Sequence, residues 1–575
     1  MRDPTTKCAS PRGRSRVRIF GAAGGVVLVL AAAALLWRSR PEPINVLLIT
    51  LDTTRADRLG CYGYARGETP SLDRLAAEGV RFAQAFTPVP LTLPAHATML
   101  TGLLPPEHGL RDNDGRMDAG IPILSEALRT RGYRTAAFLA STVLDARYGL
   151  DRGFEVYSEA RPPEKDITAD DVCSRALAWL ADQANAPFFC WVHFYDPHDP
   201  YVPPEPYRSR HPPYDGEIAF MDREIGRLLD FLERRNLERR TLVIACGDHG
   251  EALGQHDELT HGLFLYGETM RVPLILRLSG GIPKGVSNRM VPLSDIPATV
   301  ADVLRWREHA FGGRSLLAPD RTDVRCYGET LYSFNLHRWT PLYSLTTRRW
   351  KYIEAPEPEL YDRIADARET SNVLQANPVI AADLRRELER RRNAMRGPAA
   401  HRVSIDRATR ERLRSLGYGG SAPVATPSGC SMTDLRDPKT VTAVHRAYDR
   451  AVGLMDRNRH REALALVEPA AAASPESPAM NTMLTHLYFK LGTPLKAKPH
   501  IEVTAATSPV KRLVLLEAAN GFLAKGFPGE AVAYYRRVLA LPGPPEQNAE
   551  ISAVVERLSR KAGPTRPQPG SRDGE

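Results

Sequence analysis

Between residues 44 and 320, short apolar segments alternate with longer amphipathic ones, and this alternation limits the possible folds more than any other feature. The apolar segments have the length of buried strands and end in polar or turn-forming residues. They are residues 44–50, 133–140, 186–194, 241–248 and 271–278. The stretches between them have helical periodicity, at 69–80, 123–132, 174–183 and 221–236. This order predicts an α/β domain with a central, mostly parallel sheet and helices on both faces. Further strand-like pieces at 342–355 predict a small additional sheet packed on the main one.

The C-terminal part of the chain repeats with a period of 34 residues. The recurring residues are a small one (Ala463, Ala497, Ala531), a turn residue five positions earlier (Asn458, Gly492, Gly526) and a proline twelve positions later (Pro475, Pro509). This pattern is typical of helix-turn-helix units, which bury their apolar faces by stacking. It resembles the tetratricopeptide repeat over about residues 444–545, in roughly three copies. The alternative is a plain array of helical hairpins without a ligand.

Composition changes mark the boundaries of these regions. We expect the α/β domain to span 44–395 and the helical repeats to span 441–560. Residues 396–440 between them are rich in Gly, Pro and Ser and indicate a linker. The last residues, 561–575, are predicted to be a disordered tail.

The N-terminus carries most of the charge. Residues 1–40 hold eight basic residues and one acidic residue, which is +7 of the net +9. Residues 19–37 form an uncharged run long enough to span a bilayer, and the more basic flank, 1–18, is expected in the cytoplasm. We therefore predict a single-pass signal anchor in the cell membrane, with the rest of the chain extracytoplasmic, or periplasmic in a bacterium. A cleaved signal peptide is the alternative. Since the body of the chain is nearly neutral, no nucleic-acid partner is expected.

Two acidic positions follow apolar strands. Asp52 comes directly after the apolar segment INVLLITL (44–51), and the pair Asp248-His249 lies at the end of another, 241–248. In an open parallel sheet, ligand sites gather at the carboxyl ends of the strands. Carboxylate oxygens and an imidazole at such a place can bind one cation, although each motif alone is also compatible with an ordinary turn.

A hydroxyl and two histidines complete the candidate site. Thr92 lies two residues before Pro94, and a proline at this position suits the first turn of a helix. The hydroxyl of Thr92 would then lie at the N-terminus of the helix, where the free backbone N–H groups favour an anion. His198 and His261 are polar groups in aromatic surroundings that could contact substrate oxygens or protonate a leaving group. His193 alternates with apolar residues in its strand, which favours a satisfied core histidine.

These motifs together resemble the sulfatase branch of the alkaline phosphatase superfamily over about residues 44–375. The resemblance rests on VLLITLDTTRADRLGCYGY (46–64), LPAHATMLTG (93–102), DPHDPY (196–201), GDHGEALGQH (247–256) and RRWKYIEAP…ELYD (348–362). The motifs occur in the order typical of that family. The resemblance implies an α/β sandwich with a central sheet, a smaller C-terminal sheet and an ester-hydrolase activity.

The resemblance also implies a role for each matching residue. The metal ligands would be Asp52, Thr92, Asp248 and His249, with Thr92 also the nucleophile. His198 and His261 would contact the ester oxygens or assist the leaving group. We expect one divalent ion, Ca²⁺, Mg²⁺ or Mn²⁺, because the ligands are mostly oxygens. A second site, which would favour Zn²⁺, would need the two histidines together with Asp196 and Asp295.

The sequence departs from the family pattern at three positions. Formylglycine sulfatases need Cys or Ser at the nucleophile followed by x-Pro-x-Arg, whereas this chain has Thr92 and, in place of the arginine, His96. A second acidic ligand is replaced by Thr53. Threonine cannot form the aldehyde, so Thr92 would attack directly and form a covalent ester. His96 therefore joins Thr92, His198 and His261 as a candidate catalytic residue.

Three functions follow from these observations. The first is a metal-dependent hydrolase of sulfate or phosphate esters, with the threonine favouring phosphate or phosphonate. The second is a transferase on the same scaffold that passes a phosphoryl-linked head group to a lipid or glycan acceptor. The third is an inactive membrane-anchored adaptor that binds a protein partner through its helical repeats.

Overall fold

The computed structural model describes residues 43–159, 167–183, 186–319, 323–401, 403, 434–508 and 510–561. Within these ranges, no helix is long and apolar enough to cross a membrane. The predicted basic segment 1–18 and anchor 19–37 lie outside the described residues, as do most of the predicted linker and of the predicted C-terminal tail. Those predictions therefore remain predictions.

The described part of the α/β domain contains a nine-stranded sheet in the order β4-β3-β5-β1-β6-β8-β2-β7, with β9 paired to β2. The strands are β1 (Asn45–Leu51), β2 (Val80–Phe86), β3 (Arg134–Leu139), β4 (Val156–Ser158), β5 (Phe188–Phe194), β6 (Thr241–Gly247), β7 (Arg271–Val272), β8 (Leu274–Arg277) and β9 (Gly285–Pro292). The central strands β1, β5 and β6 are parallel and buried along their whole length. Because both faces of the sheet are covered here, nearly every residue of these strands is buried, which explains their continuous apolar sequences. The predicted mostly parallel central sheet is confirmed.

One predicted strand differs from expectation. The segment 271–278 is divided into β7 and β8 by Pro273, which has no backbone N–H to donate. β8 then pairs antiparallel with both β6 and β2, so this part of the sheet is mixed.

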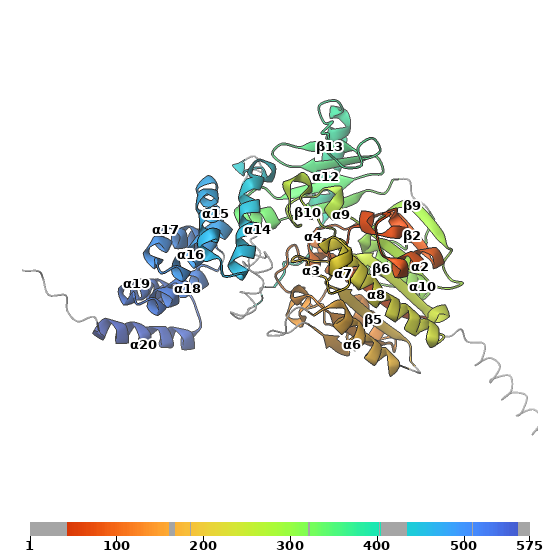
Figure 1. Cartoon of the computed structure of the whole chain (residues 1–575), viewed down its shortest axis with the longest axis horizontal. Coiled ribbons are helices and arrows are strands. Elements are labelled where there is room, and N and C mark those ends of the chain that lie inside the picture. Colours follow the sequence, from red (N-terminus) through yellow and green to blue (C-terminus); the bar gives the residue numbers. More distant parts are fainter. Residues whose placement is uncertain are drawn as a thin grey trace, which may run out of the picture. The chain divides into compact units, whose positions relative to one another are not determined.

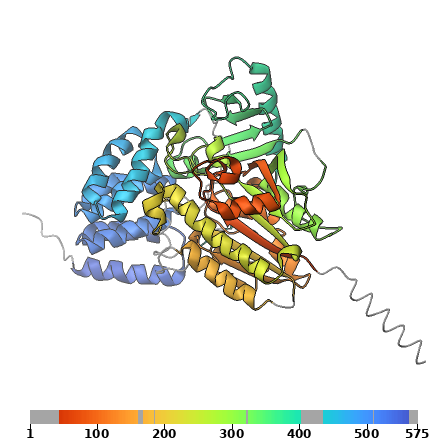
Figure 2. The same ribbon diagram turned by 45° about the vertical axis from the view of Figure 1, so that its right-hand side comes forward.

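Helices cover the sheet. They are α2 (Pro70–Glu78), α3 (Thr92–Thr101), α4 (Pro105–His108), α5 (Leu124–Arg129), α6 (Ala169–Ala181), α7 (Tyr207–Arg210), α8 (Pro213–Arg234), α9 (Gly267–Met270) and α10 (Ile296–Val303). Alternate residues of β1, such as Leu47 and Ile49, share one core with apolar residues of α2, α6 and α8. Figures 1 and 2 show α6 and α8 side by side on this face.

Helix α3 is buried on all sides, and the sequence sets both of its ends. Leu91 precedes it in an extended conformation, and Pro94 is tolerated in the first turn because N–H groups there have no intrahelical acceptor. Gly102 ends the helix with φ 76° and donates its N–H to the carbonyl of Thr98. A Cβ at Gly102 would lie 2.5 Å from a backbone oxygen of Gly312, so only glycine fits. The helix thus starts at a fixed point, with Thr92 as its first residue.

A second sheet follows the first domain, as predicted. It is antiparallel, in the order β10 (Cys326–Thr330), β11 (Leu342–Thr346), β12 (Trp350–Glu354) and β13 (Glu359–Asp362). Helix α11 (Tyr332–His337) connects β10 to β11. Helix α12 (Pro378–Ala394) packs on the sheet through Leu384 and Leu388, which share a core with Leu345.

The C-terminal region is helical, as predicted. Its helices are α14 (Thr442–Asp456), α15 (His460–Ala473), α16 (Pro478–Lys490), α17 (Lys498–Thr507), α18 (Lys511–Ala524), α19 (Pro528–Leu539) and α20 (Pro545–Lys561). The recurring alanines, Ala463, Ala497 and Ala531, are all fully buried. The recurring turn residues all have positive φ: 57° at Asn458 and 80° at Gly492 and Gly526. The 34-residue period therefore has a structural basis, while the assignment to tetratricopeptide repeats remains a prediction.

A buried ion pair connects the second sheet to the first domain. Arg111 donates to both carboxylate oxygens of Glu329, at 2.7 and 2.6 Å, and the hydroxyl of Tyr327 donates to the same group at 2.7 Å. Glu329 has no exposed side-chain surface and Arg111 has 27%. We expect Glu329→Ala to lower the free energy of unfolding by about 3–5 kcal/mol, because the guanidinium of Arg111 is left largely buried without an anion.

Comparison of the melting temperatures of Glu329→Ala and of the unaltered protein tests this expectation. Asp383→Ala is the control, since it breaks an ion pair with Arg386 at which both side chains are more than half exposed. That change should alter stability by about 0.5 kcal/mol or less. Equal melting temperatures for Glu329→Ala and the control would show that the buried pair contributes nothing.

Candidate metal centre and active site

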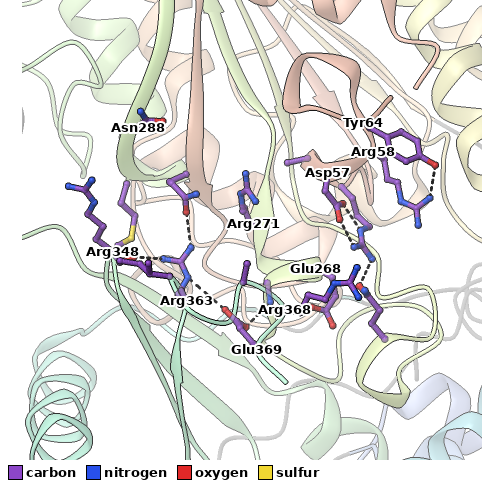
Figure 3. A pocket seen from close by; sticks show the side chains of 18 residues that line it. Asp57, Arg58, Tyr64, Glu268, Arg271, Asn288, Arg348, Arg363, Arg368 and Glu369 are labelled. Carbon is purple, nitrogen blue, oxygen red and sulfur yellow. Dashed lines mark hydrogen bonds and ion pairs between the residues drawn. The ribbon is translucent and has the colours of Figure 1, made fainter. Parts of the chain in front are cut away.

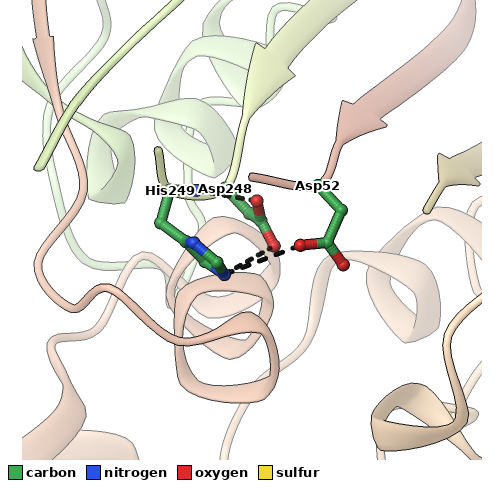
Figure 4. A group of neighbouring side chains, drawn as sticks. All are labelled: Asp52, Asp248 and His249. Carbon is green, nitrogen blue, oxygen red and sulfur yellow. Dashed lines mark hydrogen bonds and ion pairs between the residues drawn. The ribbon is translucent and has the colours of Figure 1, made fainter. Parts of the chain in front are cut away.

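Three buried ligand groups meet at one edge of the main sheet. Asp52 directly follows β1, and Asp248 and His249 directly follow β6. Because β1 and β6 are neighbouring parallel strands with Leu51 opposite Gly247, both loops leave the sheet at the same place. All three side chains are fully buried. Figure 4 shows them converging from the two strand ends.

The three groups are close enough to share one ion. His249 Nε2 lies 3.6 Å from Asp52 Oδ1 and 3.7 Å from Asp248 Oδ2. Among the described residues, they form the one group of three or more His, Cys, Asp or Glu whose ligand atoms all lie within 4.8 Å of one another. Thr92 Oγ1 is 3.3 Å from His249 Nε2. The structure thus brings together all four residues predicted as metal ligands.

The two carboxylates need a positive partner. Both oxygens of Asp52 and Oδ2 of Asp248 are buried without a hydrogen-bond partner. Burial raises the pKa of Asp52, and the nearby Glu251 raises it further. Burial also raises the pKa of Asp248, with a further contribution from Asp52. Such groups are costly unless paired, so the donor set fits a divalent cation held by Asp52, Asp248 and His249 with Thr92 beside it.

Backbone contacts orient two of the ligands. Oδ1 of Asp248 accepts the N–H groups of Thr53 and His249, so the free oxygen Oδ2 points toward Asp52. The ring of His249 donates from Nδ1 to the carbonyl of Gly250 at 3.0 Å, which leaves the lone pair of Nε2 facing the site. Burial lowers the pKa of His249 and keeps the ring neutral, as a metal ligand must be.

Two further histidines, His96 and His193, lie next to the ligand cluster. His96, one turn along α3, donates from Nδ1 to the carbonyl of Thr92 at 2.7 Å and lies 3.7 Å from Asp248 Oδ2. The centre of its ring lies 4.8 Å from the ring centre of His193. The catalytic role predicted for His96 remains a prediction, and these contacts place its ring next to Thr92 and Asp248.

The interpretation of His193 as a satisfied core histidine is wrong. The residue is fully buried, but its Nε2 has no hydrogen-bond partner and lies 3.3 Å from Asp52 Oδ2. Nδ1 lies 3.0 Å from the hydroxyl of Thr50, which also accepts the indole N–H of Trp191 and so has its own hydrogen left for the histidine. In that arrangement Nε2 carries the hydrogen of the ring and lies close to Asp52 without a hydrogen bond to it. Periodicity in β5 shows that the side chain is buried, but it does not show which group it faces.

The other two predicted histidines lie on the far side of His249. The ring centre of His261 is 4.4 Å from that of His249 and 5.2 Å from that of His198. His198 donates from Nδ1 to the carbonyl of Asp199 at 2.7 Å, and His261 Nδ1 lies 3.1 Å from Glu251 Oε1. Burial lowers the pKa of His261 to about 4. Both rings are therefore held in place by contacts at Nδ1.

The sequence analysis missed Glu251. This fully buried carboxyl group accepts a hydrogen bond from the hydroxyl of Tyr201 at 2.9 Å and contacts His261, and burial raises its pKa to about 8. Its position three residues after Asp248, within the same motif, was the available signal.

The two acidic residues proposed for a second ion do not belong to a close ligand cluster among the described residues. Asp295 lies at the N-terminus of α10, where its carboxylate accepts the N–H of Arg314. Neither it nor Asp196 belongs to a cluster of three close ligand groups among the described residues. The number of ions therefore remains a prediction.

The position of His193 leads to a test. We expect His193→Leu to weaken divalent-metal affinity by about 10–100-fold, because Asp52 loses the ring that faces it. Competition with a chromogenic chelator measures the affinity. His108→Leu is a matched control, since His108 is equally buried but contacts Thr98 and the N–H of Leu110. Equal metal affinity in the two variants would contradict a positioning role for His193.

Comparison with known proteins agrees with this geometry. Residues 44–305 match the model of the Sulfatase family. The chain is 24% identical over 428 residues to the uncharacterized sulfatase YidJ of Escherichia coli (strain K12), a match that covers 60% of this chain and 85% of that protein. It is 26% identical over 401 residues to N-acetylgalactosamine-6-sulfatase of Canis lupus familiaris, covering 57% and 76%. The solved structure of a phosphonate monoester hydrolase of Agrobacterium radiobacter superposes with a TM-score of 0.54 at 22% identity, covering 61% of this chain and 95% of that one.

Residues 44–305 match the Sulfatase family model, and the buried ligand cluster at the edge of the main sheet lies within this range. The protein is a sulfatase-like ester hydrolase whose C-terminal region is helical.

Proposed function

We propose that this protein hydrolyses sulfate or phosphate esters with Thr92 as nucleophile and one divalent metal ion. The observation that carries the proposal is the position of Thr92 Oγ1, 3.3 Å from His249 Nε2 and next to two carboxylates that have unpartnered oxygens. The ion, held by Asp52, Thr92, Asp248 and His249, would supply positive charge to the hydroxyl and to the ester oxygens. Ca²⁺, Mg²⁺ and Mn²⁺ all suit this oxygen-rich set.

The chain's own residues account for the remaining steps. Thr92 Oγ1 attacks the central atom of the ester and forms a covalent ester at the first residue of α3. His198 and His261, whose rings are held by contacts at Nδ1, contact the ester oxygens or protonate the departing alcohol. Glu251 fixes the ring of His261 in this role. Water then displaces the group from Thr92 and restores the hydroxyl.

The identity of the nucleophile favours one substrate class. Threonine cannot form the aldehyde on which formylglycine sulfatases depend, so direct attack with a covalent intermediate is required. This mode suits phosphoryl transfer, in which catalysis rests on positioning and charge neutralisation. The similarity to a phosphonate monoester hydrolase supports phosphate or phosphonate esters as substrates, and the similarity to sulfatases supports sulfate esters.

A panel of esters tests the proposal. The purified protein is incubated with an aryl sulfate, a phosphate monoester, a phosphate diester and a phosphonate monoester, each with Mg²⁺, Ca²⁺, Mn²⁺ or Zn²⁺. We expect metal-dependent cleavage of at least one ester. Absence of cleavage across the panel would favour the inactive-adaptor function.

The same panel separates hydrolysis from transfer. With an added acceptor alcohol, a hydrolase releases mainly the free acid, whereas a transferase forms a new ester with the alcohol. We propose hydrolysis, with the domain placed outside the cytoplasmic membrane by the predicted anchor at 19–37. The helical C-terminal region is proposed to bind a protein partner.

A further inference from the structure

A polar pocket lies outside the ligand cluster. Its volume is about 740 Å³, and none of Asp52, Thr92, Asp248 and His249 lines it. Its wall is formed by the segment after β1, by parts of β2 and β9, and by residues 363–369 after β13 (Figure 3). Six arginines but only three carboxylates line it: Arg55, Arg58, Arg271, Arg348, Arg363 and Arg368 against Asp57, Glu268 and Glu369.

All three carboxylates already have partners. Asp57 accepts two hydrogen bonds from Arg55, each of 2.8 Å. Glu268 is paired with His256, and Glu369 with the buried Lys351 at 2.8 Å. Glu369 also lies 3.7 Å from Nε of Arg363, and none of the three carboxylates forms an ion pair with Arg271, Arg348 or Arg368 among the described residues.

Two more arginines are also fixed by neighbours. Arg58 donates to Asp215 at 3.2 Å. Arg363 donates to the side-chain oxygen of Gln84 at 2.7 Å and to the carbonyl of Thr347 at 2.8 Å. These guanidinium groups shape the wall and add positive charge to it.

Three arginines remain without an anionic partner among the described residues. Arg271 donates from Nε to the carbonyl of Ala83 at 3.1 Å, and neither of its Nη atoms has a partner there. Arg348 and Arg368 are exposed, and their guanidinium groups contact no acceptor in the described structure. In Figure 3, Arg271 stands between the groups around Arg363 and Asp57 with no interaction drawn to either.

Arg271 is the most informative of the three because it is partly buried. Burial lowers the pKa of its guanidinium, as expected for a charge that has lost water without gaining an anion. A partly desolvated guanidinium costs free energy that a bound anion can offset. Its two free Nη atoms also match the spacing of two oxygens on one tetrahedral oxyanion.

We propose that this pocket is a binding site for a ligand that carries a sulfate or phosphate group, with the Nη atoms of Arg271 as its bidentate anchor. Arg348 and Arg368 at the exposed side would contact further oxygens. The volume is that of a small-molecule site, so an organic anion fits and not only a free ion. The site is separate from the ligand cluster, and the inference does not depend on turnover by Thr92.

Calorimetric titration of a protein that cannot use the metal centre tests this inference. The full chain with Thr92→Ala is stripped of metal with a chelator, dialysed, and titrated separately with inorganic sulfate, phosphate and pyrophosphate. We expect saturable binding of at least one of them, weakened about 10-fold or more by Arg271→Gln. The preference among the three ions shows whether the natural ligand is sulfated or phosphorylated.

The controls keep the test decisive. Arg129→Gln changes an exposed arginine that does not line the pocket and should bind as before. Should Arg271→Gln fail to fold, the double variant Arg348→Gln/Arg368→Gln at exposed positions replaces it, with weakened binding expected. Absence of saturable binding by any of the three ions, or binding that these variants leave unchanged, would overturn the proposal.

Discussion

Thr92→Ala is expected to lower ester cleavage by about 1,000-fold or more while the protein keeps its fold. The hydroxyl is the group that attacks, and among the described residues no other Ser or Thr hydroxyl or Cys thiol is hydrogen-bonded to a side chain of the cluster; the hydroxyl of Thr54 donates to the backbone carbonyl of Asp52. Alanine is well tolerated in a helix, so α3 should form as before. Steady-state kinetics on the best ester of the panel, together with the melting temperature, measure both effects.

Two further variants make this result specific. Thr98→Ala removes an equally buried hydroxyl from the same helix, where it contacts His108 rather than the ligand cluster, and should leave kcat within a few-fold of the parent. Thr92→Ser keeps a hydroxyl and should retain measurable activity. Undiminished kcat in Thr92→Ala would remove the nucleophile assignment, whatever the other variants show.

Asp248→Asn is expected to abolish metal-dependent activity and yet to raise the melting temperature of the metal-free protein. Asparagine can still accept the N–H groups of Thr53 and His249, while its amide replaces the oxygen that faces Asp52. Without metal, the change removes a buried carboxylate whose pKa is raised by burial and by Asp52. With metal, it removes a charged ligand.

Thermal melting with and without ions measures both halves of this prediction. A divalent ion at 100 times its dissociation constant should raise the free energy of unfolding of the parent protein by about 2.7 kcal/mol. The same ion should change the free energy of unfolding of Asp248→Asn only slightly. The prediction would be contradicted if no divalent ion changed the melting temperature of the parent protein. It would also be contradicted if metal-free Asp248→Asn melted well below the metal-free parent.

The parts of the site that depend on strand ends could be predicted from the sequence. Asp52 and Asp248 follow apolar runs that are long enough to be buried strands, and parallel strands bring such positions to one edge. Thr92 was found because Pro94 marks the first turn of a helix. In each case, a short local pattern determines where the side chain lies.

What could not be predicted depends on contacts between distant segments. The pairing of β8 is one case, because an apolar run gives no direction for its neighbours. His193 is another, since the sequence pattern predicts its burial in β5 but not that its Nε2 lies 3.3 Å from Asp52, directly after β1. The arginine-lined pocket has no sequence signal, because its residues lie between positions 55 and 369.

Crystals of the protein grown with Mn²⁺ offer the most direct test of the central claim, that one divalent ion joins two strand ends to the hydroxyl of α3. We predict a single anomalous peak about 2.0–2.3 Å from oxygens of Asp52, Asp248 and Thr92 and from Nε2 of His249. Density that lacks a peak between these residues, or that shows the Thr92 hydroxyl turned away from a bound ion, would contradict it.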